Sequence, residues 1–308
     1  MREIGGYLEL DKPFGKEYYP EAIKLNSAQN AVAYLNRVKK ISKLYLPYYL
    51  CDSVVGMCHR EGIDYELYHV DKDFLPLFDK NIGETERFYI VNFYGQLSRE
   101  QLLAYPNVIV DNVHAFFTPP MEGVDTLCSC RKYFGVPDGA YLISNAPRIA
   151  LEQDRSYARM RHILGRYDCA CASEHYGSFQ SNEDEVLSMP LRQMSALTQH
   201  LLSSVDYAQV KAARQANWQT LHEALGERNG LRLRTPPAPY MYPFYTERGG
   251  QLRSALAAQK IYIPTLWPNV LTGEASDIEK DYARNILPLP IDQRYDQKDM
   301  ERIIEALL

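Results

Sequence analysis

The chain has 308 residues, of which 46% are hydrophobic and 24% charged, a composition that is typical of globular proteins and excludes a disordered or fibrous chain. At roughly 150 residues per domain, this length predicts two domains, or one large domain with an appendage. The 34 Lys and Arg residues against 39 Asp and Glu residues leave a net charge of -5. No overall positive field exists to hold a nucleic-acid backbone or an anionic membrane, so we expect neither as a partner.

The N-terminus and the cysteines indicate the compartment. The first residues lack the apolar segment of a signal peptide, and no stretch approaches 18 apolar residues without a charge or a proline. Six cysteines in a chain of this length are too few for a disulfide scaffold. We therefore expect a cytoplasmic protein with free thiols.

In the first half, short β-rich apolar runs alternate with stretches of helical periodicity, which is typical of parallel strands joined by crossover helices. Helices are predicted over 27–40, where Asn26 and Ser27 are good N-caps, and over 51–61, closed by Gly62. Strands are predicted at 43–47, 65–70, 87–93, 107–111, 126–130 and 140–144. The pattern predicts an α/β fold with a mostly parallel central sheet.

In the second half, strand signals are absent from about 157 to 225, and helices are predicted over 191–204 and 207–225. A proline-rich connector at 235–240 precedes an apolar run at 240–245, a helix at 251–259, a strand at 261–263 and a terminal helix at 297–308. We expect a large domain at 1–205 and a small α+β domain at 206–308.

Two residues at predicted strand ends are candidates for chemistry. The strand Val-Ile-Val ends on Asp111, and ligands of open parallel sheets bind just beyond the carboxyl ends of the strands. Lys132 follows the next strand among aromatic residues, where removal from water would leave its amine neutral and nucleophilic. The simpler alternatives are that Asp111 caps the next turn and that Lys132 is a solvated surface lysine.

The order of these segments resembles that of the DegT/DnrJ/EryC1/StrS aminotransferases, a pyridoxal 5'-phosphate (PLP) family of fold-type I, and the chain is identified as a divergent and short member. The segment 23–31 resembles the family's Ser-Gly-Thr-x-Ala turn, which opens a helix. The resemblance implies that Ser27, Ala28 and Gln29 bind the cofactor phosphate. A helix start suits this role because its amides are unpaired and its end is positive.

Two further segments carry the resemblance. Residues 111–115 are similar to Asp-x-Ala-Gln/His-Ala, which implies that Asp111 pairs with the pyridinium nitrogen and that His114 contacts the ring. Lys132, with Pro-Asp-Gly-Ala at 137–140, matches Lys-x-x-x-x-Gly-Glu-Gly-Gly, so Lys132 corresponds to the Schiff-base lysine. A buried carboxylate is needed because PLP is an effective electron sink only while its ring nitrogen is protonated.

The sequence departs from the family at two cofactor contacts. The phosphate-binding serine normally lies five residues before the lysine, where this chain has Leu127, and Ser129 is the available hydroxyl. The aromatic residue that stacks on the cofactor ring is replaced near its place by Cys51, and Tyr48 or Tyr49 are the candidate substitutes.

No metal site is expected. The pairs Cys128/Cys130 and Cys169/Cys171 have one intervening residue, whereas paired zinc ligands usually have two or more between them.

By resemblance, the chain is expected to be an aminotransferase that acts on a nucleotide-linked keto sugar, with glutamate as the amino donor, in polysaccharide or antibiotic-sugar biosynthesis. The resemblance also implies a homodimer, and Lys132 would move a proton between the substrate and cofactor carbons. The alternative is a fold-type I relative that binds PLP or a sugar nucleotide without transamination. Sugar dehydration is disfavoured because the family's dehydratases have His in place of the lysine.

Overall fold

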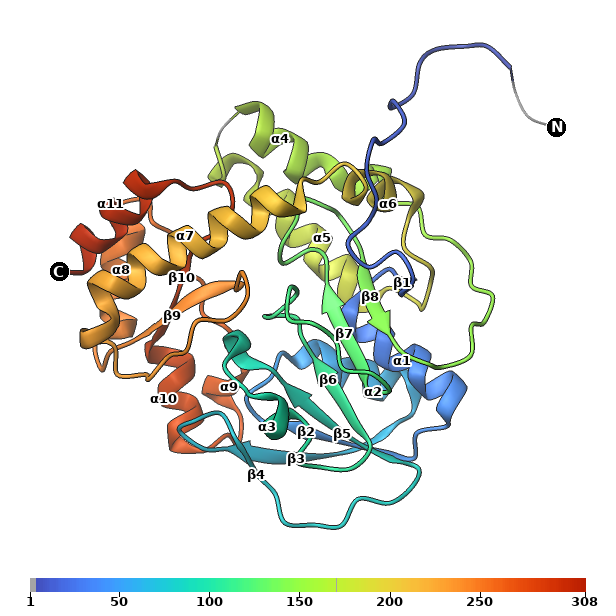
Figure 1. Cartoon of the computed structure of the whole chain (residues 1–308), viewed down its shortest axis with the longest axis horizontal. Helices are drawn as coiled ribbons and strands as arrows, with labels where there is room; N and C mark the ends of the chain where they lie inside the picture. Colours follow the sequence, from blue (N-terminus) through green and yellow to red (C-terminus); the bar gives the residue numbers. More distant parts are fainter. Residues whose placement is uncertain (1–3, 170) are drawn as a thin grey trace.

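The computed structural model describes residues 4–169 and 171–308. Its centre is an eight-stranded sheet with the strand order β1-β8-β7-β6-β5-β2-β3-β4 (Figure 1). The strands are β1 (Ile23–Leu25), β2 (Lys43–Pro47), β3 (Asp64–Val70), β4 (Pro76–Leu77), β5 (Glu86–Val91), β6 (Val108–Asp111), β7 (Asp125–Ser129) and β8 (Ala140–Ile143).

Five neighbouring strands, β3, β2, β5, β6 and β7, are parallel, which confirms the mostly parallel sheet predicted from the sequence. Strand β8 is antiparallel to β7, and β1 is antiparallel to β8. Two reversals give β1 the direction of β7, so the carboxyl ends of β1, β6 and β7 share one edge of the sheet. Ligands of open parallel sheets bind beyond this edge, where the strands have their carboxyl ends.

Helices α1 (Ala28–Lys39) and α2 (Asp52–Glu61) follow β1 and β2, and their ends match the sequence signals. The Ser27 side chain accepts a hydrogen bond from the Asn30 amide at the start of α1. Helix α2 ends at Gly62, whose φ of +65° lies in the left-handed region that glycine adopts without steric cost.

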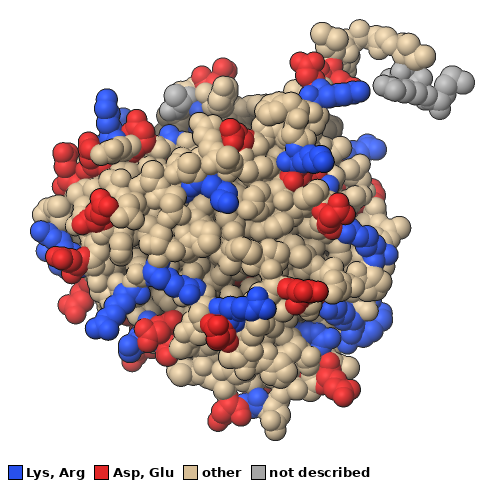
Figure 2. Space-filling model, in the orientation of Figure 1, with Lys and Arg blue, Asp and Glu red and all other residues tan. Residues whose placement is uncertain are grey.

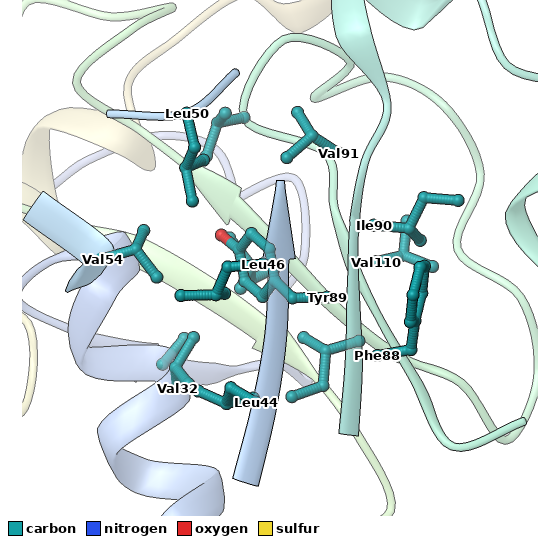
Figure 3. Close-up of a cluster of buried hydrophobic side chains, with 14 of the residues drawn as sticks. Val32, Leu44, Leu46, Leu50, Val54, Phe88, Tyr89, Ile90, Val91 and Val110 are labelled. Carbon is teal, nitrogen blue, oxygen red and sulfur yellow. The ribbon is translucent and has the colours of Figure 1, made fainter. Parts of the chain in front are cut away.

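The main core lies between these helices and the sheet (Figure 3). Val32 from α1 and Val54 from α2 belong to the same buried cluster as Leu44 and Leu46 of β2 and residues 88–91 of β5. Strands that are covered on both faces form continuous apolar runs, which explains why the sequence signals for these strands are strong.

The remaining helices follow β5 and β8 or lie in the C-terminal part of the chain. The α-helices are α3 (Arg99–Leu102), α4 (Arg161–Cys169), α5 (Tyr176–Ser188), α6 (Ala196–Leu202), α7 (Tyr207–Leu225), α8 (Gly249–Ala258), α9 (Asn269–Thr272), α10 (Asp277–Asn285) and α11 (Gln297–Leu307). Single 3-10 turns are η1 (Phe93–Gly95), η2 (Tyr157–Met160), η3 (Ser173–His175) and η4 (Gly226–Arg228).

The C-terminal part has a core of its own. Strands β9 (Met241–Tyr245) and β10 (Ile286–Pro290) form an antiparallel pair. Trp218 of α7, Tyr242 of β9, Leu287 of β10 and Met300 of α11 belong to one buried cluster. The domain division at residue 205 stays a prediction.

Two predicted elements are wrong. Residues 261–263 are not a strand: Ile261 and Ile263 are buried in the C-terminal core, but their backbone is irregular, and β10 is the partner of β9 instead. The helix predicted over 191–204 begins only at Ala196, after the N-cap Ser195. The residues before Ser195 extend along the end of the sheet, where Gln193 bridges to Leu25.

Among the helices of the described ranges, none has the length and apolarity needed to cross a membrane. On the face shown in Figure 2, acidic and basic side chains are interspersed. This face therefore presents no extended patch of one charge.

Candidate active site

Backbone hydrogen bonds join the start of α1 to the loop that carries Lys132. The Gly139 amide donates to the Asn26 carbonyl at 2.9 Å, and the Cys130 amide donates to the Gly139 carbonyl at 3.0 Å. The loop between β7 and β8 is thus closed at its base beside Ser27. Because β6 neighbours β7, Asp111 lies at the same sheet edge.

Asp111 is a buried carboxylate with no cationic contact in the described residues. It is 3% exposed, and it accepts hydrogen bonds from the Tyr89 hydroxyl at 2.6 Å and the Val113 amide at 2.8 Å. Burial raises the pKa of Asp111 to about 6, against the opposing effects of the two hydrogen bonds and the Lys132 charge. Each carboxylate oxygen has one donor and retains a lone pair for another.

His114 is fully buried, and both of its ring nitrogens lack a hydrogen-bond partner in the described structure. Its ring stacks against Tyr240 at a centroid distance of 5.1 Å and against Trp267 at 5.4 Å. Burial, followed by the charge of Lys132, holds the pKa of His114 well below its usual value, so the ring is neutral. The Tyr94 ring lies 5.2 Å from the His114 ring, and its buried hydroxyl interacts with the Tyr49 hydroxyl. Unpaired buried polar groups are rare and indicate a place where a ligand or water bonds.

Lys132 is half-buried, and its Nζ atom lies 5.2 Å from the centre of the Tyr240 ring. It forms no ion pair within the described ranges. A protonated amine at this distance is attracted by the negative charge of the aromatic face.

Arg214 of α7 fixes the residue that follows Lys132. Its guanidinium is 1% exposed and stacks on the Tyr133 ring at 4.4 Å. It donates to the Tyr133 carbonyl at 3.3 Å, to the carbonyls of 239–240 at 3.0 and 3.1 Å, and to Gln293 at 3.1 Å. Gln293 also donates to the Tyr133 carbonyl, at 2.8 Å. The position of the lysine loop therefore depends on the C-terminal part of the chain.

The far end of the loop is fixed by Asp138 and Gly139. The fully buried Asp138 carboxylate accepts hydrogen bonds from the Ser195 amide at 2.9 Å, the Ser195 hydroxyl at 2.8 Å and the Thr198 hydroxyl. Gly139 has a φ of +116°, and an added Cβ would lie 3.0 Å from Thr198 Cγ2. The Asp-Gly pair of the lysine motif is therefore a structural anchor onto α6.

The predicted phosphate residues lie at the start of α1, but one is engaged elsewhere. The side-chain amide of Gln29 donates to the carbonyls of Val186 and Leu187 at 3.0 and 3.1 Å, so it holds the end of α5. The main-chain amides of Ala28 and Gln29 belong to the first turn, where no helical carbonyl pairs with them. Ser129 is buried at the end of β7, opposite Ala140. The phosphate contacts of Ser27, Ala28, Gln29 and Ser129 stay predictions.

The two tyrosines considered for ring stacking already have aromatic neighbours. Tyr48 stacks on His69 at 4.4 Å, and the buried Tyr49 packs edge-on against Trp267 at 4.7 Å. The aromatic residues that stack on His114 are Tyr240 and Trp267, which sequence reasoning missed. No local pattern identifies them, because both lie more than 100 positions from His114 in the chain.

One group with metal-ligand chemistry was also missed. The ligand atoms of Cys169, Glu174 and His175 lie within 4.8 Å of one another at the surface of α4 and η3. Cys128 and Cys130 are buried, and all six cysteines are free thiols.

The comparison with solved structures identifies the fold. No family model matches the sequence, and no curated protein matches it. DesV of S. venezuelae, solved with a ketimine intermediate, is 20% identical, with 93% of this chain and 83% of DesV covered at a TM-score of 0.63. A DegT DnrJ EryC1 StrS aminotransferase from Brucella abortus is 14% identical, with 93% and 84% covered at 0.59. DesI, solved with its TDP-sugar product, is 13% identical, with 93% and 79% covered at 0.63. The chain therefore has the fold-type I architecture of the DegT/DnrJ/EryC1/StrS sugar aminotransferases, as its sequence motifs predict.

Proposed function

We propose that this chain is a PLP-dependent aminotransferase that acts on a nucleotide-linked keto sugar, with glutamate as the amino donor. The observation that carries the proposal is the placement of Asp111 and Lys132 at the ends of neighbouring strands. Within the described residues, the buried Asp111 carboxylate contacts no cation and the Lys132 amine forms no ion pair, and both follow neighbouring strands at the sheet edge where ligands of such folds bind. When bound, PLP supplies an electron sink that delocalises the charge left on the substrate carbon.

The residues present fit this cofactor. Asp111 would hold the protonated ring nitrogen, and a cation there would remove the unfavourable isolation that raises its pKa. The two ring nitrogens of His114 have no hydrogen-bond partner in the described structure and could bond to the cofactor. Since Tyr240 and Trp267 already stack on His114, we expect its contact to be made by the nitrogen-bearing edge of the imidazole.

Lys132 has two tasks in this function. Its amine would hold the cofactor covalently, and the same group would accept and return a proton at the reacting substrate carbon. Both tasks require a fixed amine, and the bracing of Tyr133 by Arg214 and Gln293 supplies this constraint.

The substrate class and the assembly belong to the same proposal. DesI, one of the similar structures, was solved with a TDP-sugar product, which supports a sugar nucleotide as the substrate class. We propose a homodimer in the cytoplasm. Exposed apolar side chains such as Tyr7, Phe14 and Tyr167 are candidates for burial in its interface.

The decisive experiment is covalent trapping of the cofactor. Protein incubated with PLP should absorb near 400 nm, lose this absorbance on borohydride reduction and carry pyridoxyl on Lys132, as located by peptide mass spectrometry. Lys211 provides a matched control because its Nζ also lies over an aromatic ring, Phe117, at 6.0 Å. Label should disappear in Lys132→Ala and persist in Lys211→Ala. Label on another lysine, or none despite excess PLP, would contradict the assignment.

The competing function is binding without transamination. It is favoured by the engagement of Gln29 with α5 and by Leu127 at the expected serine position. Glutamate separates the two functions: an aminotransferase converts bound PLP to pyridoxamine phosphate, whereas a binding protein leaves its spectrum unchanged.

A further inference from the structure

A cavity of about 340 Å³ lies among three segments that adjoin the candidate active site. Gly95 and Leu97 line it from the chain after β5, Asn112 and residues 118–121 from the chain after β6, and residues 234–237 from the connector before β9. This volume is within the range of small-molecule sites. Lys132 and His114 are not part of its lining, so it is a different site.

Two exposed arginines, Arg99 and Arg234, line the cavity. Neither Arg99 nor Arg234 forms an ion pair with any residue in the described ranges. The Arg234 guanidinium donates to the Gly95 carbonyl at 3.3 Å, and its main-chain amide donates to Gln96 Oε1 at 2.9 Å. Burial lowers the pKa of Arg234 and the charge of Glu100 opposes this, yet Glu100 directs its carboxylate to the Ser98 hydroxyl at 2.8 Å. The charge of Glu100 acts on both arginines without forming an ion pair in the described ranges, so an anion in the cavity could compete with Glu100 for the two guanidinium groups.

A buried amide provides a third donor. Asn112 is 2% exposed and lines the cavity. Its orientation is fixed by a relay: the Leu97 amide donates to Asn92 Oδ1 at 3.2 Å, and Asn92 Nδ2 donates to Asn112 Oδ1 at 3.0 Å. The Asn112 oxygen is thus already bonded to Asn92. The remaining polar group of this side chain, its amino group, is the donor that Asn112 can offer to a ligand in the cavity.

We propose that this cavity binds a small organic anion, a phosphate or carboxylate attached to an apolar group. The anionic end would bond to Arg99, Arg234 and Asn112. The apolar end would pack against the lining side chains of Leu97, Met121 and Pro236. The inference is independent of PLP chemistry at Lys132, so each can fail without the other.

The test uses the full chain and three probes of similar shape at low ionic strength. Phenyl phosphate and benzoate distinguish the two anionic groups, and benzyl alcohol is their neutral counterpart. Isothermal titration should give saturable binding of at least one anion with a Kd on the order of 1 mM, as expected for a ligand of this size. Benzyl alcohol should not bind measurably, because it lacks the charge.

Variants then locate the site. Arg99→Gln and Arg234→Gln should each weaken binding about tenfold or more, and Asn112→Asp should abolish it by placing a carboxylate against the anion. Arg228→Gln removes an exposed arginine that does not line the cavity and should stay within about twofold of the parent. Circular dichroism and melting confirm that each variant is folded. Absence of saturable binding of both anions up to about 20 mM, equal binding of the alcohol, or equal effects of Arg228→Gln and Arg234→Gln would overturn the proposal.

Discussion

In the absence of bound PLP, replacement of Asp111 by Asn should stabilise the protein. The native environment raises the pKa of Asp111 from 3.8 to about 6, which corresponds to about 3 kcal/mol of unfavourable ionisation at neutral pH. An Asn side chain avoids this cost, and its oxygen can still accept the hydrogen bond from the Tyr89 hydroxyl. Its amino group would face the Val113 amide, at a cost of about 1 kcal/mol. The net increase in the free energy of unfolding at pH 8 is therefore about 1 to 2 kcal/mol.

The sign and the pH range of this effect follow from proton linkage. Between pH 4 and 6 the native state holds the Asp111 proton more tightly than the unfolded chain, so ionisation of this group lowers stability as the pH rises through that range. The advantage of Asp111→Asn should thus be about 1.5 kcal/mol smaller at pH 5 than at pH 8. Urea unfolding of both proteins without PLP, at the two pH values, measures it. A variant that is less stable than the parent at pH 8, or a difference that is the same at both pH values, would refute the reasoning.

The same variant should be impaired in the proposed reaction. Asn cannot supply the negative charge that keeps a pyridine nitrogen protonated, so PLP binding should survive better than conversion by glutamate. Loss of one buried charge-assisted hydrogen bond, on the order of 2 to 4 kcal/mol, corresponds to roughly a thirtyfold to thousandfold slower conversion. Stopped-flow absorbance gives this rate. Equal rates in the two proteins would mean that Asp111 only caps the end of β6.

Two further predictions concern the hydrogen bonds of Arg214 and the assembly. Arg214→Met removes the donors to the Tyr133 carbonyl and to the carbonyls of 239–240. This variant should lower the free energy of unfolding by about 2 to 4 kcal/mol and slow the PLP labelling of Lys132, whereas Arg228→Gln should do neither. Unchanged stability together with unchanged labelling would contradict the role of Arg214 in holding the Lys132 loop. Sedimentation at micromolar concentration should show a homodimer, and a monomer that still binds PLP tightly would contradict it.

Local sequence patterns were sufficient for the elements that carry the candidate chemistry. The apolar strand before Asp111 and the Ser27 cap at the start of α1 are signals contained within a few neighbouring residues, and both elements form as predicted. Their arrangement at one sheet edge follows from the directions of the strands. A rule about strand ends can be applied before any contact is known.

The contacts that surround these residues could not be predicted in the same way. Gln29 bonds to carbonyls 157 and 158 positions away, and Arg214 bonds to a carbonyl 81 positions away. Residues 261–263 misled prediction because burial in a core produces the same apolar pattern as burial in a strand. Strand β10 was missed because Pro288 and Pro290 argue against a strand, although each strand of a two-stranded sheet has a free edge that tolerates proline.

The hydrogen bonds of Arg214 have a mechanical consequence. One guanidinium joins helix α7, the connector before β9, the chain after β10 and the loop of Lys132. If α7 rotates or slides, these bonds pull the loop with it, so Lys132 and helix α7 should move as one rigid unit. A hinge in this protein is therefore expected elsewhere than at the junction of α7 with the Lys132 loop. Amide hydrogen exchange at residues 133–134 should slow or quicken together with exchange in the middle of α7.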